Sequence, residues 1–147
     1  METFHIDIVS ADRSVFAGEV MFVVAPLAEG EAGFLPGHSP LLGRLKAGAL
    51  RVRDSGGVEQ AFYVSGGFVE VQPDRVIVLA DSSERGADID EARALKAVEE
   101  AEEALRDRPD KVDYARAESE LALAVARLRV ARAHKTQSSR LPHDQAR

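Results

Sequence analysis

The sequence lacks cysteine and tryptophan, and it contains no long apolar run. Without cysteine, a disulfide framework, thiolate catalysis and a cysteine-based zinc site are excluded. The four histidines, His5, His38, His134 and His143, do not lie at metal-ligand spacing from one another, so we expect no metal site. No segment approaches the roughly 20 apolar residues of a membrane-spanning helix, and no export signal is visible. We therefore expect a soluble chain in a reducing compartment.

Positive charge and catalytic motifs are also scarce. The chain has 25 acidic and 19 basic side chains, and its formal net charge of −6 argues against general binding to nucleic acid. It has neither the Gly-x-Ser-x-Gly elbow of many hydrolases nor the Gly-x-x-x-x-Gly-Lys loop of nucleotide hydrolases. Paired carboxylates such as Glu99 and Glu100 are typical of a solvated helix surface. We therefore predict a chain that has no catalytic residues and needs no cofactor.

Residues 1–84 have the pattern of a small β-domain. Apolar residues alternate or form short runs, and turn-forming residues recur about every 8 to 12 positions, as in sandwiches and barrels. Hairpins are expected across residues 54–57 and across Pro73 and Asp74. Strands are expected at 4–8, 20–25, 41–45, 49–53, 58–64, 68–71 and 76–79. Short strands protect their edges by stacking or closing, so we predict a β-sandwich or flattened barrel of about 8 to 10 strands.

Residues 88–135 follow a helical pattern instead. Alanine dominates this segment, proline and glycine nearly vanish, and charged residues recur at helical spacing. Asp88 or Asp90 is expected to cap a first helix, because its carboxylate can accept hydrogen bonds from the first free amides. That helix must end near residues 106–108, because Pro109 cannot continue it.

A second helix is expected to run from about Lys111 to His134. The remaining segment, 136–147, is polar, and we expect it to be a disordered tail. The predicted fold is therefore α+β, with a β-domain over residues 1–84 followed by an antiparallel two-helix hairpin over 88–135.

The predicted helices have narrow, alanine-rich apolar faces. The expected stripes are Leu95, Val98 and Leu105 on the first helix, and Tyr114, Ala117, Leu121, Val125 and Leu128 on the second. Alanine contacts bury little apolar area, so the hairpin either detaches from the β-domain or remains a fixed surface element. Four basic residues near the end of the second helix either meet an acidic partner or form a solvated face. They are Arg127, Arg129, Arg132 and Lys135.

Two segments of the β-domain have unusual sequences. Residues 29–40 contain three glycines and two prolines, which predict a loop ahead of a strand, but a turn alone does not require Glu31 or His38. In the other segment, Gly66 and Gly67 lie inside a strand pattern, which predicts a bulge or a close approach of two backbones.

Together these segments resemble the epsilon-subunit family of bacterial F-type ATP synthases. The stretch Gly33-Phe34-Leu35-Pro36-Gly37-His38-Ser39-Pro40-Leu41-Leu42 is similar to a loop and the following strand of that family. Ser65-Gly66-Gly67-Phe68-Val69-Glu70-Val71-Gln72-Pro73, with Val78-Leu79-Ala80-Asp81, is similar to its most recognisable stretch. The resemblance covers about Phe4 to Lys135.

The resemblance implies a non-catalytic rotor subunit in the central stalk of a proton-translocating synthase. Its β-domain would bind the gamma subunit, rest on the c-ring and couple rotation to the catalytic head formed by the alpha and beta subunits. The chain would lie at the cytoplasmic face of the bacterial inner membrane, peripherally and through the complex only. The implied interface residues for the c-ring and gamma are Glu31, Gly33, His38 and Ser39.

The resemblance also implies that the hairpin inhibits ATP hydrolysis. In the family the hairpin lies folded on the β-domain or extends along gamma into the head. Arg127, Arg129, Arg132 and Lys135 would then meet acidic loops of the catalytic subunits. The alternative interpretation of the whole chain is a free-standing β-sandwich adaptor or ligand-binding module whose helices form a fixed lid.

Some members of the family bind ATP on the folded hairpin. The corresponding residues here are Ile89, Asp90, Arg93, Ala94 and Arg127. However, Glu100 and Leu123 stand where the ATP-binding members carry further arginines. The loss of two cations weakens the attraction to a polyphosphate, so we expect weak or absent ATP binding.

Overall fold

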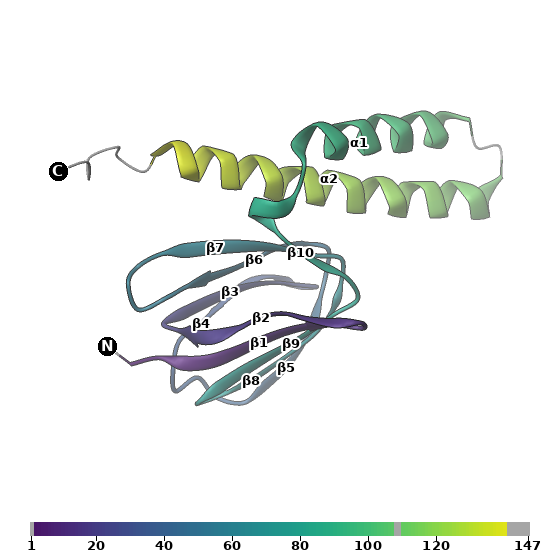
Figure 1. Cartoon of the computed structure of the whole chain (residues 1–147). Coiled ribbons are helices and arrows are strands. Elements are labelled where there is room, and N and C mark those ends of the chain that lie inside the picture. The colour runs from purple at the N-terminus through teal and green to yellow at the C-terminus, as the bar shows by residue number, and fades with distance from the viewer. Residues whose placement is uncertain (1, 108–109, 141–147) are drawn as a thin grey trace. The chain divides into compact units, whose positions relative to one another are not determined.

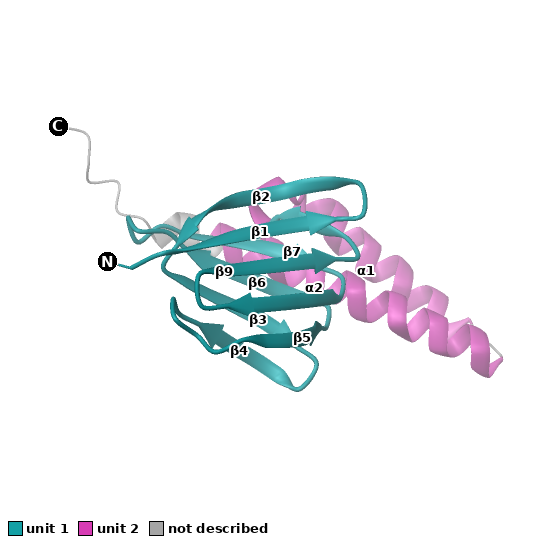
Figure 2. Ribbon diagram, turned by 90° about the horizontal axis from the view of Figure 1, so that it is seen from below, with its two compact units in different colours: residues 1–85 teal, residues 86–147 magenta. Residues whose placement is uncertain are grey.

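The computed structural model describes residues 2–107 and 110–140 (Figure 1). The chain divides into two compact units, residues 1–85 and 86–147 (Figure 2). The first unit is built from β-strands and the second from helices. This is the α+β architecture that the change of sequence pattern predicts.

Within the described residues, the first unit contains ten strands joined in one hydrogen-bonded sheet. The order is β10-β7-β6-β3-β5-β8-β9-β1-β2, and β4 pairs with β3. The β1 and β9 strands are parallel and the other pairs are antiparallel. The sheet folds over into the two layers seen in Figure 1, which confirms the predicted sandwich. The strands are β1 Phe4–Ser10, β2 Arg13–Val20, β3 Phe22–Leu27, β4 Gly30–Phe34, β5 Leu41–Leu45, β6 Gly48–Arg53, β7 Glu59–Val64, β8 Gly67–Gln72, β9 Arg75–Ala80 and β10 Ser83–Arg85.

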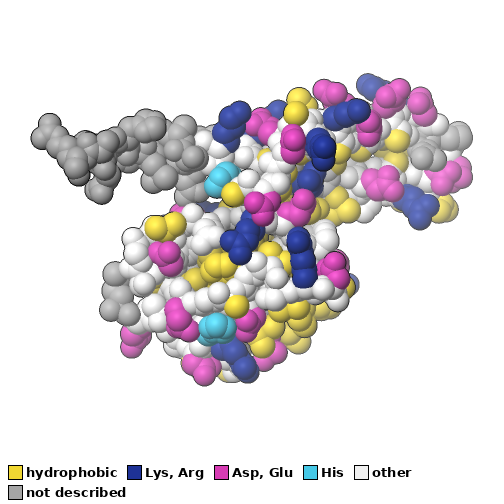
Figure 3. All heavy atoms as spheres, in the orientation of Figure 1, with side chains coloured by type: hydrophobic (Ala, Val, Ile, Leu, Met, Phe, Trp, Pro, Cys, Tyr) yellow, Lys and Arg dark blue, Asp and Glu magenta, His cyan; other side chains and the backbone are white. Residues whose placement is uncertain are grey.

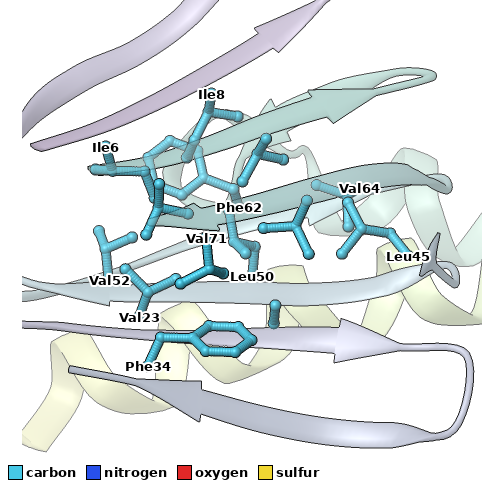
Figure 4. Packing of buried hydrophobic residues seen from close by; sticks show 14 of the residues in the cluster. Ile6, Ile8, Val23, Phe34, Leu45, Leu50, Val52, Phe62, Val64 and Val71 are labelled. Atoms are coloured by element: carbon cyan, nitrogen blue, oxygen red, sulfur yellow. The ribbon is translucent and has the colours of Figure 1, made fainter. Parts of the chain in front are cut away.

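Alternating side chains of these strands fill the space between the layers. In β1, Phe4, Ile6 and Ile8 are buried, whereas the intervening His5 and Asp7 are partly exposed. The other strands contribute the aromatic and branched residues drawn in Figure 4. Burial of each large side chain stabilises the fold by about 1.5 to 3 kcal/mol relative to exposure. The core therefore forms one continuous apolar cluster inside the first unit.

Three strands differ from the sequence prediction. The expected loop over 29–40 was wrong in its first half, because β4 occupies Gly30–Phe34. Glycine-rich sequence disfavours a strand locally, but pairing with β3 supplies the backbone hydrogen bonds that compensate. The β2 and β10 strands were also missed. The sequence of β2 does not alternate regularly between apolar and polar residues, and β10 is three residues long with no apolar side chain.

The paired glycines of the β7 to β8 connection confirm the predicted close approach. Gly66 and Gly67 have φ angles of 135° and 123°, a region that side chains avoid. A Cβ atom added to Gly67 would collide with the carbonyl oxygen of Leu79. This contact fixes β8 against β9 and sets Phe68 opposite Leu79 in the sheet.

The two end strands of the sheet, β2 and β10, are joined by arginine side chains. Arg13 Nη2 donates to the carbonyl oxygen of Ser83 over 3.3 Å. Arg85 Nη2 donates to the carbonyl oxygen of Val15 over 3.2 Å. These bonds nearly close the sheet into a barrel, because each one crosses between the strands at its two ends.

The second unit begins with a short 3-10 turn, Gly86–Asp88, and continues into helix α1, Glu91–Arg106. The predicted cap is confirmed for Asp90, whose Oδ1 accepts from the amide of Arg93 at 3.1 Å. Asp110 plays the same role for α2, accepting from the amides of Val112 and Asp113 at 2.8 and 3.1 Å.

Helix α2 spans Lys111–Arg140, so it continues past the expected end at His134. Residues 136–140 are therefore helical, contrary to the expected tail from 136 onward, and residues 141–147 lie outside the described range. The segment holds neither glycine nor proline, and nothing in its sequence stops a helix at His134.

The two helices pack against each other as an antiparallel hairpin (Figure 1). Val98, Ala117 and Leu128 are buried, as their predicted stripes require. Leu95 and Tyr114 do not belong to the buried faces, since they are 39% and 47% exposed. Two alanines outside the predicted stripes are buried: Ala94 in α1 and Ala131 in α2. The small size of alanine lets two helix backbones approach closely, which explains this choice.

Candidate docking surfaces

A tight turn presents His38 at the surface of the β-domain. The His38 amide donates to the Leu35 carbonyl oxygen at 3.1 Å, and Gly37 has a φ angle of 88°. Proline followed by a glycine with positive φ is the signature of a type II turn. The Gly37 amide also donates to the carbonyl oxygen of Pro73 at 2.8 Å, which ties this loop to the turn between β8 and β9.

The His38 ring is held in a defined orientation. Its Nδ1 lies 2.7 Å from the carbonyl oxygen of Ser39, and the ring meets Phe34 edge to face with centroids 5.1 Å apart. A carbonyl oxygen can only accept, so Nδ1 must carry the hydrogen. The neutral ring therefore keeps Nε2 as an acceptor. Ser39 itself is exposed beside it.

Glu31 lies in β4 with its side chain 60% exposed. Its Oε1 accepts from Arg51 Nη2 over 2.7 Å, a short and charge-assisted contact. Arg51 Nη1 lies 3.6 Å from Glu59 Oε1, and Arg53 Nη2 lies 3.5 Å from Glu59 Oε2. The four side chains form a row of alternating charge, which we call the charge row.

Gly33 lies in the same strand as Glu31 and serves packing. A Cβ atom at Gly33 would lie 2.9 Å from the ring of Phe22, closer than real Cβ contacts. The missing side chain therefore lets the Phe22 ring lie against β4. The sequence candidate Gly33 thus shapes the surface beside Glu31.

Besides Leu41, which is 36% exposed, three large apolar side chains on the β5, β8 and β9 strands are at least half exposed. They are Leu42 at 73%, Phe68 at 50% and Leu79 at 55%, and we call them the apolar face. Phe68 pairs directly with Leu79, and Leu42 pairs with Glu70 in the neighbouring register. Figure 3 shows apolar side chains gathering on the lower surface of this unit, where β5, β8 and β9 lie in Figure 1. Grouped exposed apolar residues mark interaction surfaces.

A shallow depression connects the apolar face with the His38 loop. It has a volume of about 290 Å3 and is lined by Pro40, Leu41, Leu42, Glu70 and Gln72. Pro40 directly follows His38 and Ser39 in the sequence, so these two predicted interface residues lie a few positions before Leu42 of the apolar face.

The predicted basic residues of α2 divide into two groups. Arg132 Nε and Lys135 Nζ each lie 3.4 Å from a carboxylate oxygen of Glu91 in α1. Arg129 is exposed and Arg127 is partly exposed. Glu91 therefore links the start of the hairpin to α2, and we call this contact the Glu91 clamp.

The candidate ATP residues are placed mainly by the needs of the helix. Ile89 and Ala94 are buried at 8% and 1% exposure. Asp90 uses a carboxylate oxygen to cap α1. Arg93 is exposed. The segment thus has a structural role in starting and packing α1.

Among residues 2–107 and 110–140, no group of three or more histidine or carboxylate side chains could hold a metal ion. No helix in the same ranges is long and apolar enough to span a bilayer.

Sequence reasoning missed several residues of these surfaces. Arg51 and Glu59 are separated by eight positions along the chain and meet only because β6 pairs with β7. Leu79 belongs to β9, whose sequence is apolar on both faces, and this pattern was the available signal for an exposed apolar surface. Phe68 gave no such signal, because Glu70 and Gln72 share its face of β8. The sequence around Glu91 did not indicate its contacts with Arg132 and Lys135, because these partners lie more than 40 positions away along the chain.

The fold and these surfaces define a docking subunit of a larger assembly. A family model described as the beta-sandwich domain of the ATP synthase delta/epsilon chain matches residues 3–86. A second, described as the long alpha-helix domain of the same chain, matches residues 87–132. The chain belongs to this family, as an epsilon-type and non-catalytic subunit of ATP synthase.

Individual relatives agree with the family model. The chain is 56% identical to the ATP synthase epsilon chain of Nitrosococcus oceani over 127 residues, which are 86% of this chain and 91% of the relative. It is 51% identical to that of Nitrosospira multiformis over 128 residues, 87% and 92% of the two chains. These matches favour the predicted family over the free-standing adaptor.

Two solved structures have a similar fold. One chain belongs to the Euglena gracilis mitochondrial ATP synthase, in a structure of OSCP, F1 and the c-ring. It matches with a TM-score of 0.76 and 25% identity, over 84% of this chain and 78% of that chain. A chain from the central stalk and c-ring of the Tetrahymena thermophila mitochondrial enzyme matches with a TM-score of 0.62 and 13% identity, over 88% and 97%. The second match concerns the fold alone.

Proposed function

We propose that the chain is a rotor subunit of a proton-translocating F-type ATP synthase. Its β-domain couples rotation of the c-ring to the catalytic head through the gamma subunit. The observation that carries the proposal is the apolar face. Covering exposed apolar side chains of this size removes them from water and so stabilises a complex with a partner. The proposal assigns the chain to the cytoplasmic face of the bacterial inner membrane, where the complex holds it peripherally.

The apolar face is assigned to gamma, and Glu31 and His38 are assigned to the c-ring. Leu42, Phe68 and Leu79 offer the apolar centre that a stable protein interface needs. Glu31 and His38 offer polar groups suited to the rim of an interface or to polar loops. The depression beside Pro40 borders Leu42 of the apolar face.

Affinity for gamma tests the assignment of the apolar face. Leu79→Ser should weaken binding of the full chain to purified gamma, because a hydroxyl replaces apolar contact area. Val58→Ser is a matched control, since Val58 is 57% exposed and Leu79 is 55% exposed, and Val58 lies in the turn between β6 and β7. Equal affinity of Leu79→Ser and the unchanged chain, measured by calorimetry, would refute the assignment.

The hairpin is assigned an inhibitory role in ATP hydrolysis by the assembled enzyme. Its support is the group of basic side chains on α2, Arg127, Arg129, Arg132 and Lys135, which suits acidic loops of the alpha and beta subunits. Ending the chain after Arg85 keeps the β2 to β10 bonds and should raise hydrolytic activity while assembly is retained. Unchanged hydrolysis by an enzyme that contains the shortened chain would contradict this role.

The hairpin is also assigned weak or absent ATP binding. The support is electrostatic, because Asp90 is an anion at the candidate site and Glu91 already pairs with Arg132 and Lys135. Calorimetric titration of the full chain with ATP tests this assignment. A micromolar dissociation constant would contradict it.

A further inference from the structure

The Glu31 side chain is held by an arginine from a strand that is not its hydrogen-bonded neighbour. Glu31 in β4 lies opposite Pro26 of β3, and Arg51 in β6 lies opposite Val24 of the same strand. Val24 and Pro26 are two residues apart, so both point to the same face. The contact between Glu31 and Arg51 therefore spans β3 on the outer face of the sheet.

Arg51 is itself held from its other side. Its Nη2 donates to Glu31 Oε1 at 2.7 Å, and its Nη1 lies 3.6 Å from Glu59 Oε1. Glu59 is the most buried member of the charge row, with its side chain 23% exposed, and Arg53 also pairs with it at 3.5 Å. The planar guanidinium of Arg51 is thus oriented by carboxylates at both ends.

We propose that Arg51 is a positioning residue that prepares Glu31 for docking, and that the group docking on Glu31 is a hydrogen-bond donor. The inference rests on the proposed docking role of Glu31. In the described part of the chain, the carboxylate of Glu31 uses Oε1 for Arg51, which leaves Oε2 as the acceptor that faces a partner.

The charge of the pair restricts the chemistry of the partner. Arg51 neutralises Glu31, so long-range attraction to a cation is reduced, while the acceptor capacity of Oε2 remains. An uncharged donor, such as an amide or a hydroxyl of a polar loop, fits this site. An acidic partner does not fit, because Oε2 would repel it. Fixing the side chain before docking also lowers the entropy lost on binding.

The test compares single substitutions in the assembled enzyme in membrane vesicles. Glu31→Ala and Arg51→Ala should both reduce proton pumping at a fixed rate of ATP turnover, and the Arg51→Ala loss should be roughly two- to fivefold. Arg53→Ala is the matched control, because Arg53 also pairs with Glu59 but not with Glu31. It should pump normally. Arg51→Lys should recover part of the loss, since it keeps the charge.

An exchange of the two charges distinguishes the docking role from a merely structural ion pair. Glu31→Arg combined with Arg51→Glu rebuilds the pair with a donor at position 31, and Glu59→Gln in the same chain removes the like charge that would otherwise face the new carboxylate. Pumping should stay low, while the thermal unfolding of the full chain should return toward that of the unchanged protein. Full recovery of pumping would show that the ion pair alone matters, and it would overturn the inference.

The single substitutions separate this inference from the function on which it rests. Normal pumping by Glu31→Ala would remove the docking role of Glu31 itself. Reduced pumping by Glu31→Ala together with normal pumping by Arg51→Ala would leave that role in place and overturn the positioning role of Arg51.

Discussion

The guanidinium carbon of Arg85 lies 5.8 Å from the centroid of the Phe16 ring. It also lies 6.0 Å from the centroid of the Phe62 ring, and the two rings are 5.4 Å apart. Together with the bond from Arg85 to the Val15 carbonyl oxygen, these contacts join β10, β2 and β7. A single exposed arginine thus holds the last strand of the β-domain immediately before the helical unit begins.

Arg85→Ala should destabilise the β-domain. A hydrogen bond contributes about 0.5 to 1.5 kcal/mol and an exposed cation–π contact about 0.5 to 1 kcal/mol, so we expect the free energy of unfolding to fall by about 1 to 2 kcal/mol. Urea unfolding of the full chain measures it. Arg75→Ala is the control, since Arg75 is exposed and has no ion pair or hydrogen bond through its side chain to other residues in the described ranges. Equal losses for both variants would contradict the role of Arg85.

Ser83→Ala should stabilise the chain. The Ser83 hydroxyl is buried, and among the described residues its Oγ has no hydrogen-bond partner. Its backbone carbonyl oxygen, which accepts from Arg13, is unaffected by the substitution. Removing an unpaired buried hydroxyl should raise the free energy of unfolding by about 1 kcal/mol. A loss of stability would show that the hydroxyl has a favourable partner.

Gly67→Ala should be far more damaging than Gly57→Ala. Both glycines have positive φ, 123° and 81°, but only Gly67 adds a steric collision of the new Cβ with Leu79. Nothing lies within 4 Å of a Cβ added at Gly57. We expect a loss of about 1 kcal/mol at Gly57 from backbone strain alone, and a loss of more than about 3 kcal/mol at Gly67. Similar thermal midpoints for the two variants would contradict this account.

Local sequence predicted those parts of the fold that local chemistry determines. The cap at Asp90 and the hairpin turn at 54–57 both follow from side chains that bond to nearby amides, and both are present. The strand β4 could not be predicted in this way, because its glycines favour a loop and its stability comes from pairing with β3.

The candidate site residues were predictable only in part for the same reason. Glu31 and His38 stood out because turn chemistry did not require them. Arg51, the partner of Glu31, did not stand out, since its contact with Glu31 depends on the sheet register across β3. The Glu91 clamp likewise depends on how two helices align, and a sequence pattern does not fix that alignment.

Glu91→Gln should strengthen the proposed inhibition of ATP hydrolysis. In the folded hairpin, Glu91 pairs with Arg132 and Lys135, and both of these residues are also proposed to meet the catalytic head. Arg132 and Lys135 cannot pair with Glu91 and contact the catalytic head at the same time, so the two contacts compete. Loss of two exposed ion pairs costs the folded hairpin about 0.5 to 1.5 kcal/mol, so its population relative to an extended form should fall roughly two- to tenfold.

Steady-state ATP hydrolysis by the assembled enzyme measures this effect, and Glu99→Gln is the matched control. Glu99 is exposed on the same helix, and its side chain has no ion pair with other residues within the described ranges. Hydrolysis should fall for Glu91→Gln and remain unchanged for Glu99→Gln. The difference should shrink as ionic strength rises, because salt screens exposed ion pairs. If Glu91→Gln raised hydrolysis, the Glu91 clamp would favour the inhibitory form. That result would refute the proposal that Glu91 and the catalytic head compete for Arg132 and Lys135.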